Sequence, residues 1–342
     1  MSNPAFTLTE QAELRERNSL RIGARAEHLA VVHQASAVPS LLADPRFADR
    51  PVKVLGGGSN VLIAADVAGL LVHLDTRGRR VAGQDGDDVR VCVAAGENWH
   101  DLVLWSLGQG LGGLENLSLI PGSVGAAPIQ NIGAYGVELS DCLHSVTAYD
   151  RRLREWIELD RSTCGFGYRD SRFKQEPGRF VLTGVTLTLS RKRPLRLDYA
   201  GIREELEALA VREPDANAVS AAVIRLRRRK LPDPAQLPNA GSFFKNPVVG
   251  AEFAEDLLRR HPALPRWPLG DGRVKLAAGW LIEAAGCKGY RVGDAGVAPG
   301  HALVLVNFAA ASGKDVLELA QRIQQQVATR FGVSLEIEPV LL

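Results

Sequence analysis

Cysteine is scarce in the sequence, and the few cysteines lie far apart. The four are Cys92, Cys142, Cys164 and Cys287. No two of them form a Cys-x-x-Cys pair, so the sequence predicts neither a disulfide framework nor a zinc site, and we expect no metal. Unpaired thiols are typical of proteins in a reducing compartment. The sequence therefore indicates a cytoplasmic protein.

Long apolar runs and a surplus of one charge are also missing. No stretch approaches the roughly 20 apolar residues that cross a bilayer. The N-terminal segment up to Arg17 contains Glu10, Glu13 and Glu16 and no apolar core of a signal peptide. The 41 lysines and arginines nearly balance the 39 acidic residues, which gives a net charge of +2. Because nucleic acids and anionic membranes attract basic surfaces, we expect neither as a partner, and no particular protein partner is indicated.

Glycine, by contrast, is plentiful, and the chain is long enough for more than one domain. Of its 342 residues, 46% are hydrophobic and 23% are charged, as in ordinary globular proteins. Chains of this length usually form two or three domains. The 34 glycines are about one residue in ten, against a usual share of about 7%. Their clustering indicates loops in which the backbone closely approaches another group.

The pattern of apolar residues changes near residue 193. Before this point, short β-branched runs predict strands at 52–55, 61–63, 70–74, 89–95 and 185–189. Asn98 is expected to cap a helix that ends at Gly108. Beyond residue 193 we expect helices over 201–211 and 216–230, a last helix from Ser312 to a C-cap at Gly332, and a strand over 333–337. The chain is therefore predicted to be α+β.

The first glycine cluster follows a short apolar strand and reads Gly56, Gly57, Gly58, Ser59 and Asn60. Successive glycines let backbone N–H groups point into one concavity, where no Cβ obstructs a phosphate. Ser59 and Asn60 add side-chain donors. A tight turn between two strands explains the same residues, and the loop alone does not decide between the two.

The second glycine-rich segment runs from residue 119 to 136 and contains no charged residue. An ordinary surface loop of this length carries charge, so the segment predicts close approach of the backbone to a large flat ligand. A buried crossover loop is the alternative. A third cluster, Gly108 to Gly113, fits the Gly-x-Gly-x-x-Gly pattern, but a helix is predicted before it where a dinucleotide site requires a strand. We therefore interpret Gly108 and Gly110 as a helix end.

Taken together, these residues resemble the UDP-N-acetylenolpyruvoylglucosamine reductase family. The matching segments are VLGGGSNVL at 54–62, IPGSVGA at 120–126, NIGAYG at 131–136, YRDSRFK at 168–174, KLPDP at 230–234, NAGSFFKNP at 239–247, AGWLI at 278–282 and LEIE at 335–338. Their order along the chain makes the resemblance specific. Two features depart from the family: a glycine, Gly57, stands where a polar residue is common, and the chain ends at Leu342, soon after Pro339.

The resemblance implies the domain organisation and the cofactors. Residues 16–193 would form an FAD-binding domain of the vanillyl-alcohol-oxidase (PCMH) type in two α+β subdomains, and residues 194–342 an α+β substrate-binding domain. The last helix and strand, about 313–342, are expected to pack back on the first subdomain. FAD would be bound without a covalent link, and NADPH would donate the hydride. The implied cofactor-binding residues are Gly56, Gly57, Gly58, Ser59, Asn60, Pro121, Gly122, Ser123, Gly125, Ala126, Gly133, Ala134 and Tyr135.

The implied reaction reduces an enolpyruvyl ether of a UDP-sugar to a lactyl ether during peptidoglycan synthesis. Arg169 matches the group that stabilises the enolate, although the residues alone also allow a salt bridge with Asp170. Ser242 matches the proton donor, although a Gly-Ser pair is more often a turn or a helix cap. Glu338 matches a second catalytic carboxyl, although Glu336 shares its face in a strand.

The resemblance also implies a set of substrate-binding residues. These are Tyr199, Lys230, Asn246 and Glu283. The presence of Tyr199 resembles a longer subtype in which a tyrosine loop covers the substrate, and Lys230 would meet the diphosphate. The arginines at positions 225 to 229 are interpreted as a solvated helix end, where cations suit the helix dipole.

Two other functions stay open from the sequence. One is a different FAD-dependent oxidoreductase of the same fold, such as a sugar oxidase. Enzymes of that kind often tether flavin through a histidine or cysteine in the first loop, and residues 56–60 have neither. The other is a nucleotide-sugar binder without activity, which the joint presence of Arg169, Ser242 and Glu338 disfavours.

Overall fold

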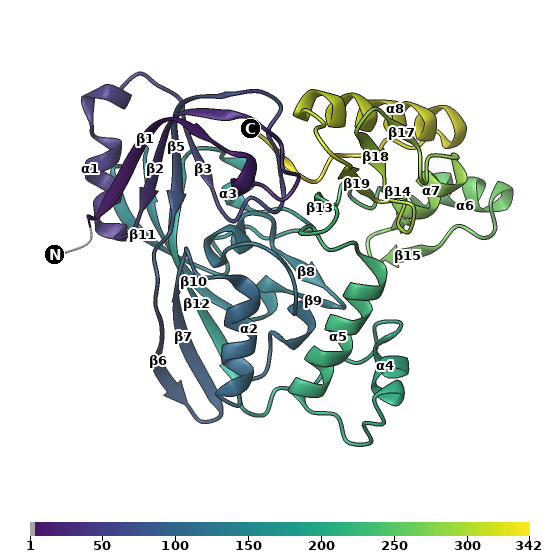
Figure 1. The fold of residues 1–342 in the computed structure, drawn as a ribbon. Helices are drawn as coiled ribbons and strands as arrows, with labels where there is room; N and C mark the ends of the chain where they lie inside the picture. The colour runs from purple at the N-terminus through teal and green to yellow at the C-terminus, as the bar shows by residue number, and fades with distance from the viewer. Residues whose placement is uncertain (1–3) are drawn as a thin grey trace. The chain divides into compact units, whose positions relative to one another are not determined.

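The computed structural model describes residues 4–342, which form a mixture of helices and strands (Figure 1). Within the described residues, contacts divide the chain into two compact units. Unit 1 holds the residues up to Ala12, Ala26–Gly58 and Val67–Arg229, and unit 2 holds Glu13–Arg25, Ser59–Asp66 and Lys230–Leu342. The predicted α+β class is confirmed. The domain boundary at residue 193 and the packing of residues 313–342 on the first subdomain stay predictions.

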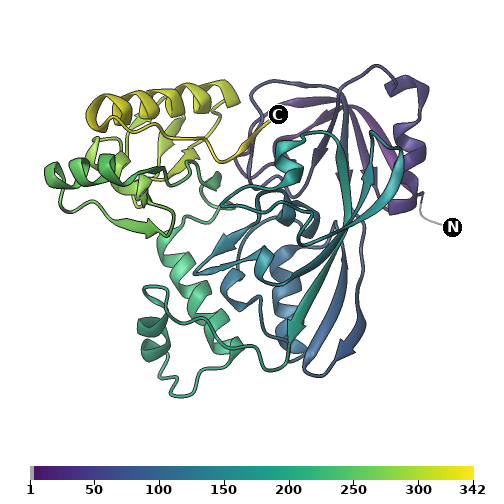
Figure 2. The same ribbon diagram turned by 180° about the vertical axis from the view of Figure 1, so that it is seen from behind.

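Unit 1 contains two larger sheets. The first has the strand order β1 (Phe6–Glu13), β2 (Arg25–Val32), β5 (Val67–Leu74), β3 (Val52–Leu55), with β5 parallel to both of its neighbours. The second is antiparallel, in the order β11 (Glu155–Asp160), β10 (Leu143–Asp150), β12 (Phe180–Ser190), β7 (Asp88–Ala94), β6 (Arg79–Asp85) (Figures 1 and 2). A small hairpin joins β8 (Gly133–Ala134) and β9 (Val137–Glu138).

The helices of unit 1 are α1 (Val38–Leu42), α2 (Trp99–Gly108), α3 (Arg172–Gln175), α4 (Ile202–Ala208) and α5 (Ala216–Lys230), whose last residue is counted with unit 2. Helices α1, α2 and α3 share apolar clusters with these sheets, whereas α4 and α5 bury their apolar faces in a cluster of their own. Asn98 caps α2 by accepting the N–H of Asp101 at 3.1 Å, as predicted. Trp99 and the strand residue Val91 are both fully buried in one apolar cluster. The Gly108–Gly113 segment follows this helix, which confirms that it is no dinucleotide fingerprint.

Unit 2 is built on smaller sheets. One has the order β13 (Asn239–Ser242), β19 (Val304–Asn307), β18 (Ala295–Val297), β17 (Arg291–Val292), and another the order β14 (Val248–Gly250), β16 (Arg273–Leu276), β15 (Arg266–Leu269). The short strands β4 (Val61–Leu62) and β20 (Val340–Leu341) pair in parallel. The helices are α6 (Ala251–Arg260), α7 (Ala278–Ala284) and α8 (Gly313–Phe331).

The C-terminal segment tests two predictions with opposite outcomes. The last helix, α8, begins with the predicted capping box, in which Ser312 N donates to Asp315 Oδ2 at 2.8 Å, and ends at Gly332 with φ 69°. The strand expected over 333–337 is wrong. The Leu335 carbonyl accepts a hydrogen bond from Gln324 of α8 at 2.8 Å, and only Ile337 forms a bridge, with Phe244. The segment therefore contacts its own helix at Leu335 and pairs only briefly around Ile337, where Lys245 N donates to the Glu336 carbonyl and Glu338 N to the Phe243 carbonyl, both at 2.9 Å.

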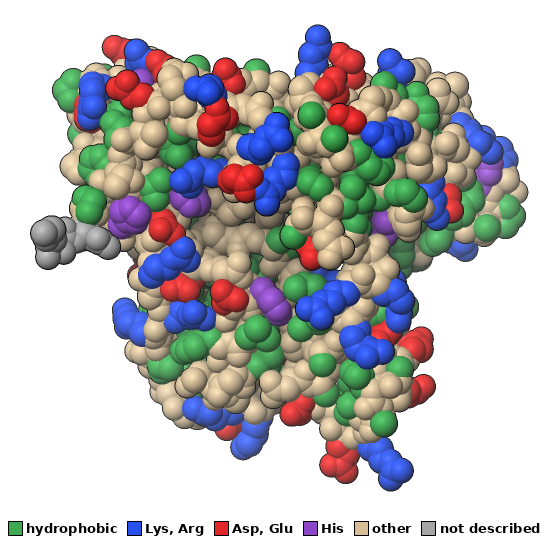
Figure 3. Space-filling model, in the orientation of Figure 1, with side chains coloured by type: hydrophobic (Ala, Val, Ile, Leu, Met, Phe, Trp, Pro, Cys, Tyr) green, Lys and Arg blue, Asp and Glu red, His purple; other side chains and the backbone are tan. Residues whose placement is uncertain are grey.

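Basic and acidic side chains alternate over the face drawn in Figure 3. This distribution agrees with the net charge of +2. Within residues 4–342, no helix is both long and apolar enough to span a membrane.

Candidate active site

The two glycine loops, which the sequence presents more than 60 positions apart, lie against each other in unit 1. A Cβ on Gly56 would lie 2.8 Å from the Ala126 Cβ, and one on Gly57 only 2.7 Å from the Gly122 Cα. Real Cβ atoms do not approach this closely, so both glycines are required for the loops to meet. Part of the glycine pattern therefore reflects packing between loops, as well as access for a ligand.

The same loops also leave backbone donors available. Gly58 and Gly122 have φ values of 66° and 121°, which favour glycine. In the described part of the chain, no hydrogen bond uses the backbone N–H of Gly57, Gly58, Gly122 or Ser123. Unused N–H groups on adjoining glycine loops are donors suited to an anion such as a diphosphate. These residues fit the pyrophosphate of FAD.

The last two residues of the first loop belong to unit 2. The Ser59 carbonyl accepts from the Ser19 hydroxyl at 3.3 Å, and the Asn60 carbonyl accepts from Val340 N at 3.0 Å. The backbone carbonyls of Ser59 and Asn60 thus form hydrogen bonds with two other segments of unit 2, around Ser19 and around Val340. Their role towards the cofactor stays a prediction.

Arg169 contacts the second glycine-rich segment through its side chain. Its Nη2 donates to the Gly133 carbonyl at 2.7 Å, and a Cβ at Gly133 would approach Arg169 Nη1 to 3.1 Å. Arg169 itself has φ 54°, a left-handed conformation that costs energy in an arginine. Asp170 accepts from Gln175 Nε2 at 2.8 Å and from Ser171 N at 2.9 Å, and the salt bridge between Asp170 and Arg169 stays an untested alternative. The guanidinium of Arg169 is thus held beside the glycine segment by a hydrogen bond and by a strained backbone conformation.

Two predicted ligand residues from distant parts of the sequence meet in unit 1. The rings of Tyr135 and Tyr199 pack edge to face with centroids 5.0 Å apart. Burial raises the pKa of Tyr135, so its hydroxyl stays protonated and can donate a hydrogen bond. Tyr199 is 47% exposed, which leaves its hydroxyl accessible to a ligand. Tyr135, predicted to bind the cofactor, and Tyr199, predicted to bind the substrate, therefore pack against each other.

Ser242 and Glu338 lie on adjoining backbone segments of unit 2. Ser242 ends β13 and pairs with Val304, so it caps no helix. The next residue, Phe243, accepts a hydrogen bond from Glu338 N at 2.9 Å. Gly241, with φ 73°, bends the chain just before the serine. Two of the three predicted catalytic residues are thus brought together by backbone pairing that the sequence did not reveal.

The structure also distinguishes the two C-terminal glutamates. Glu336 is exposed and forms an ion pair with Lys245. This ion pair engages the charge of Lys245, a lysine that the sequence offered as a group to tune the acidity of Ser242. Glu338 is partly buried. The identification of Glu338 as the catalytic carboxyl is consistent with this difference in exposure.

The predicted substrate residues of unit 2 lie around α7. The Asn246 side-chain oxygen caps this helix by accepting Ala278 N at 3.0 Å, and Glu283 pairs with Lys288 at 2.9 Å. His301 was not predicted. Its Nδ1 accepts from the backbone N–H of Leu303 at 3.3 Å, and burial lowers its pKa, with the charge of Lys230 adding to the effect. A lone histidine after Gly300 carries no motif, so only the fold reveals its proximity to Lys230.

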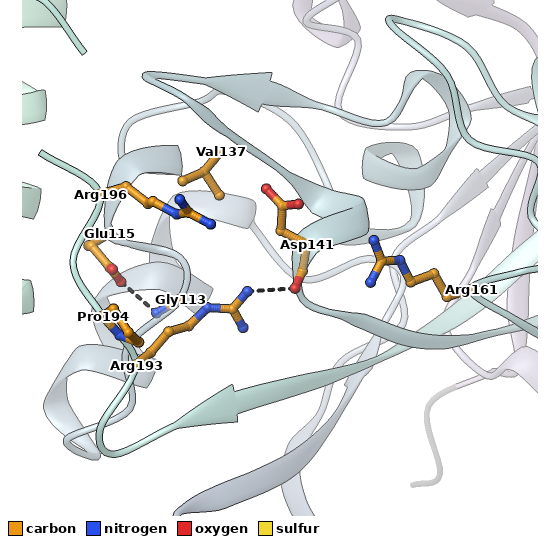
Figure 4. A pocket seen from close by; sticks show the side chains of 8 residues that line it. All are labelled: Gly113, Glu115, Val137, Asp141, Arg161, Arg193, Pro194 and Arg196. Atoms are coloured by element: carbon orange, nitrogen blue, oxygen red, sulfur yellow. Dashed lines mark hydrogen bonds between the residues drawn. The ribbon is translucent and has the colours of Figure 1, made fainter. Parts of the chain in front are cut away.

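A separate polar cavity of about 80 Å³ lies in unit 1 (Figure 4). Three arginines line it together with two acidic residues: Arg161, Arg193, Arg196, Glu115 and Asp141. Arg193 already donates to the Asp141 carbonyl, and Glu115 accepts Gly113 N at 2.6 Å. None of the predicted site residues contributes to this cavity, which is therefore not the predicted active site.

Two of the cysteines, Cys142 and Cys164, are deeply buried. Burial raises the pKa of Cys142 and of Cys164 to about 12, so both thiols stay protonated. Among residues 4–342, no group of three or more histidine, cysteine or acidic side chains is arranged to hold a metal ion.

Comparison with known families finds two matching models. The first, "FAD binding domain", matches residues 26–152, and the second, "UDP-N-acetylenolpyruvoylglucosamine reductase, C-terminal domain", matches residues 233–342. Two similar proteins are both named UDP-N-acetylenolpyruvoylglucosamine reductase. The one from Chromobacterium violaceum is 53% identical, over 96% of this chain and 97% of its own. The one from Pseudomonas aeruginosa is 51% identical, over 98% of this chain and 99% of its own.

Comparison with solved structures agrees. The crystal structure of UDP-N-acetylenolpyruvylglucosamine reductase from Thermus caldophilus matches with a TM-score of 0.69 and 27% identity, over 98% of both chains. A solvent-stable cholesterol oxidase matches with a TM-score of 0.50 and 14% identity, over 97% of this chain and 87% of its own. At that identity the second match indicates a shared fold alone.

Proposed function

The chain belongs to the UDP-N-acetylenolpyruvoylglucosamine reductase family, and from this membership we propose how its residues perform the reaction. The protein reduces the enolpyruvyl ether of UDP-N-acetylglucosamine to UDP-N-acetylmuramate, a precursor of peptidoglycan. FAD, reduced by NADPH, supplies the hydride that the terminal carbon of the enol ether receives. The observation that carries the proposal is the pair of touching glycine loops beside Arg169 in unit 1.

We assign the flavin to the glycine loops. The free N–H groups of Gly57, Gly58, Gly122 and Ser123 receive the pyrophosphate, because amide donors suit its charge and no Cβ stands in the way. The remaining predicted cofactor residues line the same loops and carry no formal charge. The domain that holds the flavin extends over residues 16–193, and residues 194–342 form the substrate domain.

Arg169 stabilises the charge that develops during the reaction. Negative charge spreads from the carbon next to the ether oxygen into the carboxylate of the substrate, and a guanidinium offers paired donors to such a group at any physiological pH. The hydrogen bond to Gly133 and the strained backbone hold the guanidinium in place before the substrate arrives. Preorganisation of this kind lowers the barrier because the donors need no rearrangement.

Ser242 donates the proton that completes the reaction, and Glu338 assists. A hydroxyl is a weak acid, so it acts effectively only on a strongly basic carbanion. Glu338 lies on the segment that pairs with Phe243, next to the serine in the chain. Lys230 binds the substrate diphosphate, and Tyr199 covers the substrate and offers it a hydroxyl. Asn246 and Glu283 contact the nucleotide-sugar, and the protein acts in the cytoplasm.

The experiment that tests this proposal follows the yellow colour of the purified protein without oxygen. Stoichiometric NADPH is expected to bleach the flavin, and the enolpyruvyl UDP-sugar is expected to restore it with formation of UDP-N-acetylmuramate. If a sugar or a hydroxy acid bleaches the flavin while NADPH does not, the protein is an oxidase of the same fold. A protein that binds the UDP-sugar but carries no flavin would be a binder without this activity.

A further inference from the structure

Helix α5 carries a row of basic residues near its end, and the structure separates them into two kinds. Arg225 and Arg229 are four residues apart and share one face of the helix. Both form ion pairs with the buried carboxylate of Glu205, Arg225 Nε at 2.9 Å from Glu205 Oε2. These two arginines lower the pKa of Glu205. Their charges are compensated, and their role in holding α4 against α5 is structural.

Arg227 lies on the opposite side of α5, because two residues turn a helix by about 200°. Its side chain is partly buried. No described residue forms a hydrogen bond or an ion pair with it, since neither the carboxylates nor the carbonyls of residues 4–342 reach its guanidinium. A buried charge without a partner costs free energy, and burial accordingly lowers the pKa of Arg227. The expectation that these arginines form a solvated helix end is wrong at this position.

The face of α5 that carries Arg227 is directed towards the second glycine segment. Ser220 lies two turns before Arg227 on this face, and its Oγ is 2.7 Å from the Ser118 Oγ. Tyr135 and Arg169 are close enough for their charges to affect the pKa of Arg227, and Arg169 adds repulsion. The protein thus places Arg227 near Tyr135 and near a second guanidinium, that of Arg169.

The position of Arg227 along α5 indicates which anion it serves. Lys230, expected to meet the substrate diphosphate, comes three residues later on a neighbouring part of the helix surface. Figure 3 shows several basic side chains over α5. Arg228, the residue after Arg227, is exposed. Arg227 differs from Arg228 in its burial and in its proximity to Tyr135.

We propose that Arg227 binds a phosphate oxygen of the nucleotide diphosphate that enters the substrate site, the UDP-sugar in one half-reaction and NADPH in the other. A diphosphate would provide Arg227 with the negative charge that no described carboxylate provides. The paired N–H donors of the guanidinium match two oxygens of the diphosphate. The inference rests on the proposed function for the identity of the nucleotides. According to this proposal, Arg227 lowers the stability of the free protein and raises its affinity for the nucleotide.

The test compares the flavin-containing protein with three variants. Arg227→Met removes the charge and keeps an apolar chain, Arg227→Lys keeps a charge without the paired donors, and Arg228→Met is the exposed control on the same helix. Binding of UDP and of NADP⁺ is measured separately by equilibrium dialysis, with the flavin content and the Tm of each variant without nucleotide. Arg227→Met is expected to weaken nucleotide binding about 10- to 100-fold, Arg227→Lys to restore part of it, and Arg228→Met to change it less than about 2-fold.

The two nucleotides serve as separate arms. Weaker binding of UDP alone, or of NADP⁺ alone, identifies which diphosphate uses Arg227, and weaker binding of both means that they share it. The Tm of Arg227→Met without nucleotide is expected to equal or exceed that of the wild type, because an uncompensated charge is removed.

Three results would overturn the proposal: unchanged binding of both nucleotides, loss of flavin, which would assign the arginine to FAD, or a lower Tm, which would make the arginine structural. Wild-type protein whose flavin NADPH does not bleach would contradict the proposed function instead, while the UDP arm would still decide the role of Arg227.

Discussion

The residues assigned to the flavin in unit 1 and those assigned to the substrate in unit 2 are held in place by different means. In unit 1 the cofactor loops consist of backbone, glycine and residues with positive φ, and their close contact leaves no room for a Cβ. In unit 2 the proposed chemistry depends on the side chains of Ser242, Glu338 and Lys230, which lie on paired backbone segments and at a helix end. Backbone geometry is thus expected to control flavin binding, and side-chain functional groups to control the fate of the substrate.

The largest effect is expected when only a side-chain oxygen of unit 2 is removed. Ser242→Ala should leave reduction of the flavin by NADPH near its normal rate, because no proton is delivered to the substrate in that step. Reoxidation by the enolpyruvyl substrate should slow about 100- to 10,000-fold, or roughly 3 to 5.5 kcal/mol of barrier. Stopped-flow absorbance of each half-reaction measures both.

A conservative replacement serves as the control for the serine. Ser242→Cys should recover part of the rate, because a thiol also donates a proton. Reoxidation of Ser242→Ala at the wild-type rate would mean that Ser242 only completes the strand, and Glu338 would become the next candidate for the donor.

The matching change in unit 1 adds one carbon to the backbone. In Gly57→Ala the new Cβ would lie 2.7 Å from the Gly122 Cα, so the loops must separate, at a cost of about 1–3 kcal/mol. We expect loss of flavin, measured as the ratio of flavin to protein absorbance. Gly108→Ala is the control, because no atom lies within 4 Å of its Cβ at the end of α2. It should keep its flavin and gain up to about 1 kcal/mol in the free energy of unfolding.

The sequence could predict features that depend on neighbours in the chain. The caps of α2 and α8, the end of α5 and the break in the dinucleotide pattern are all local, and all are confirmed. The contact between the glycine loops, the bond from Arg169 to Gly133 and the environment of Arg227 join residues far apart, so no local pattern contains them. The strand predicted over 333–337 failed for a similar reason, since the Leu335 carbonyl accepts a hydrogen bond from Gln324 of α8.

A smaller effect is expected at the substrate diphosphate. Lys230→Ala should weaken binding of the UDP-sugar by about 1.5–3 kcal/mol, the usual cost of losing a hydrogen bond to a charged group, and leave flavin binding unchanged. Lys314→Ala, an exposed lysine on α8, is the control and should change neither. Titration of flavin absorbance with the substrate gives both dissociation constants. Equal affinities in the two variants would remove Lys230 from the site.

The smallest effect is expected for the removal of one hydroxyl in unit 1. Tyr199→Phe keeps the ring that packs on Tyr135 and loses only the hydrogen bond of its hydroxyl, so substrate affinity should fall by about 0.5–1.5 kcal/mol. The Tm should not change, because the ring contact persists. A fall in flavin content would show instead that the aromatic pair supports the cofactor.

The division between the two units is tested most directly by measuring flavin content and reoxidation rate together in Gly57→Ala and Ser242→Ala. Gly57→Ala is expected to lose flavin, and whatever fraction still holds it should be reoxidised by the enolpyruvyl substrate near the wild-type rate. Ser242→Ala is expected to hold a full complement of flavin that the substrate reoxidises at least about 100-fold more slowly. If both variants lose flavin and reoxidation rate in parallel, backbone geometry and side-chain chemistry are not separable in this protein.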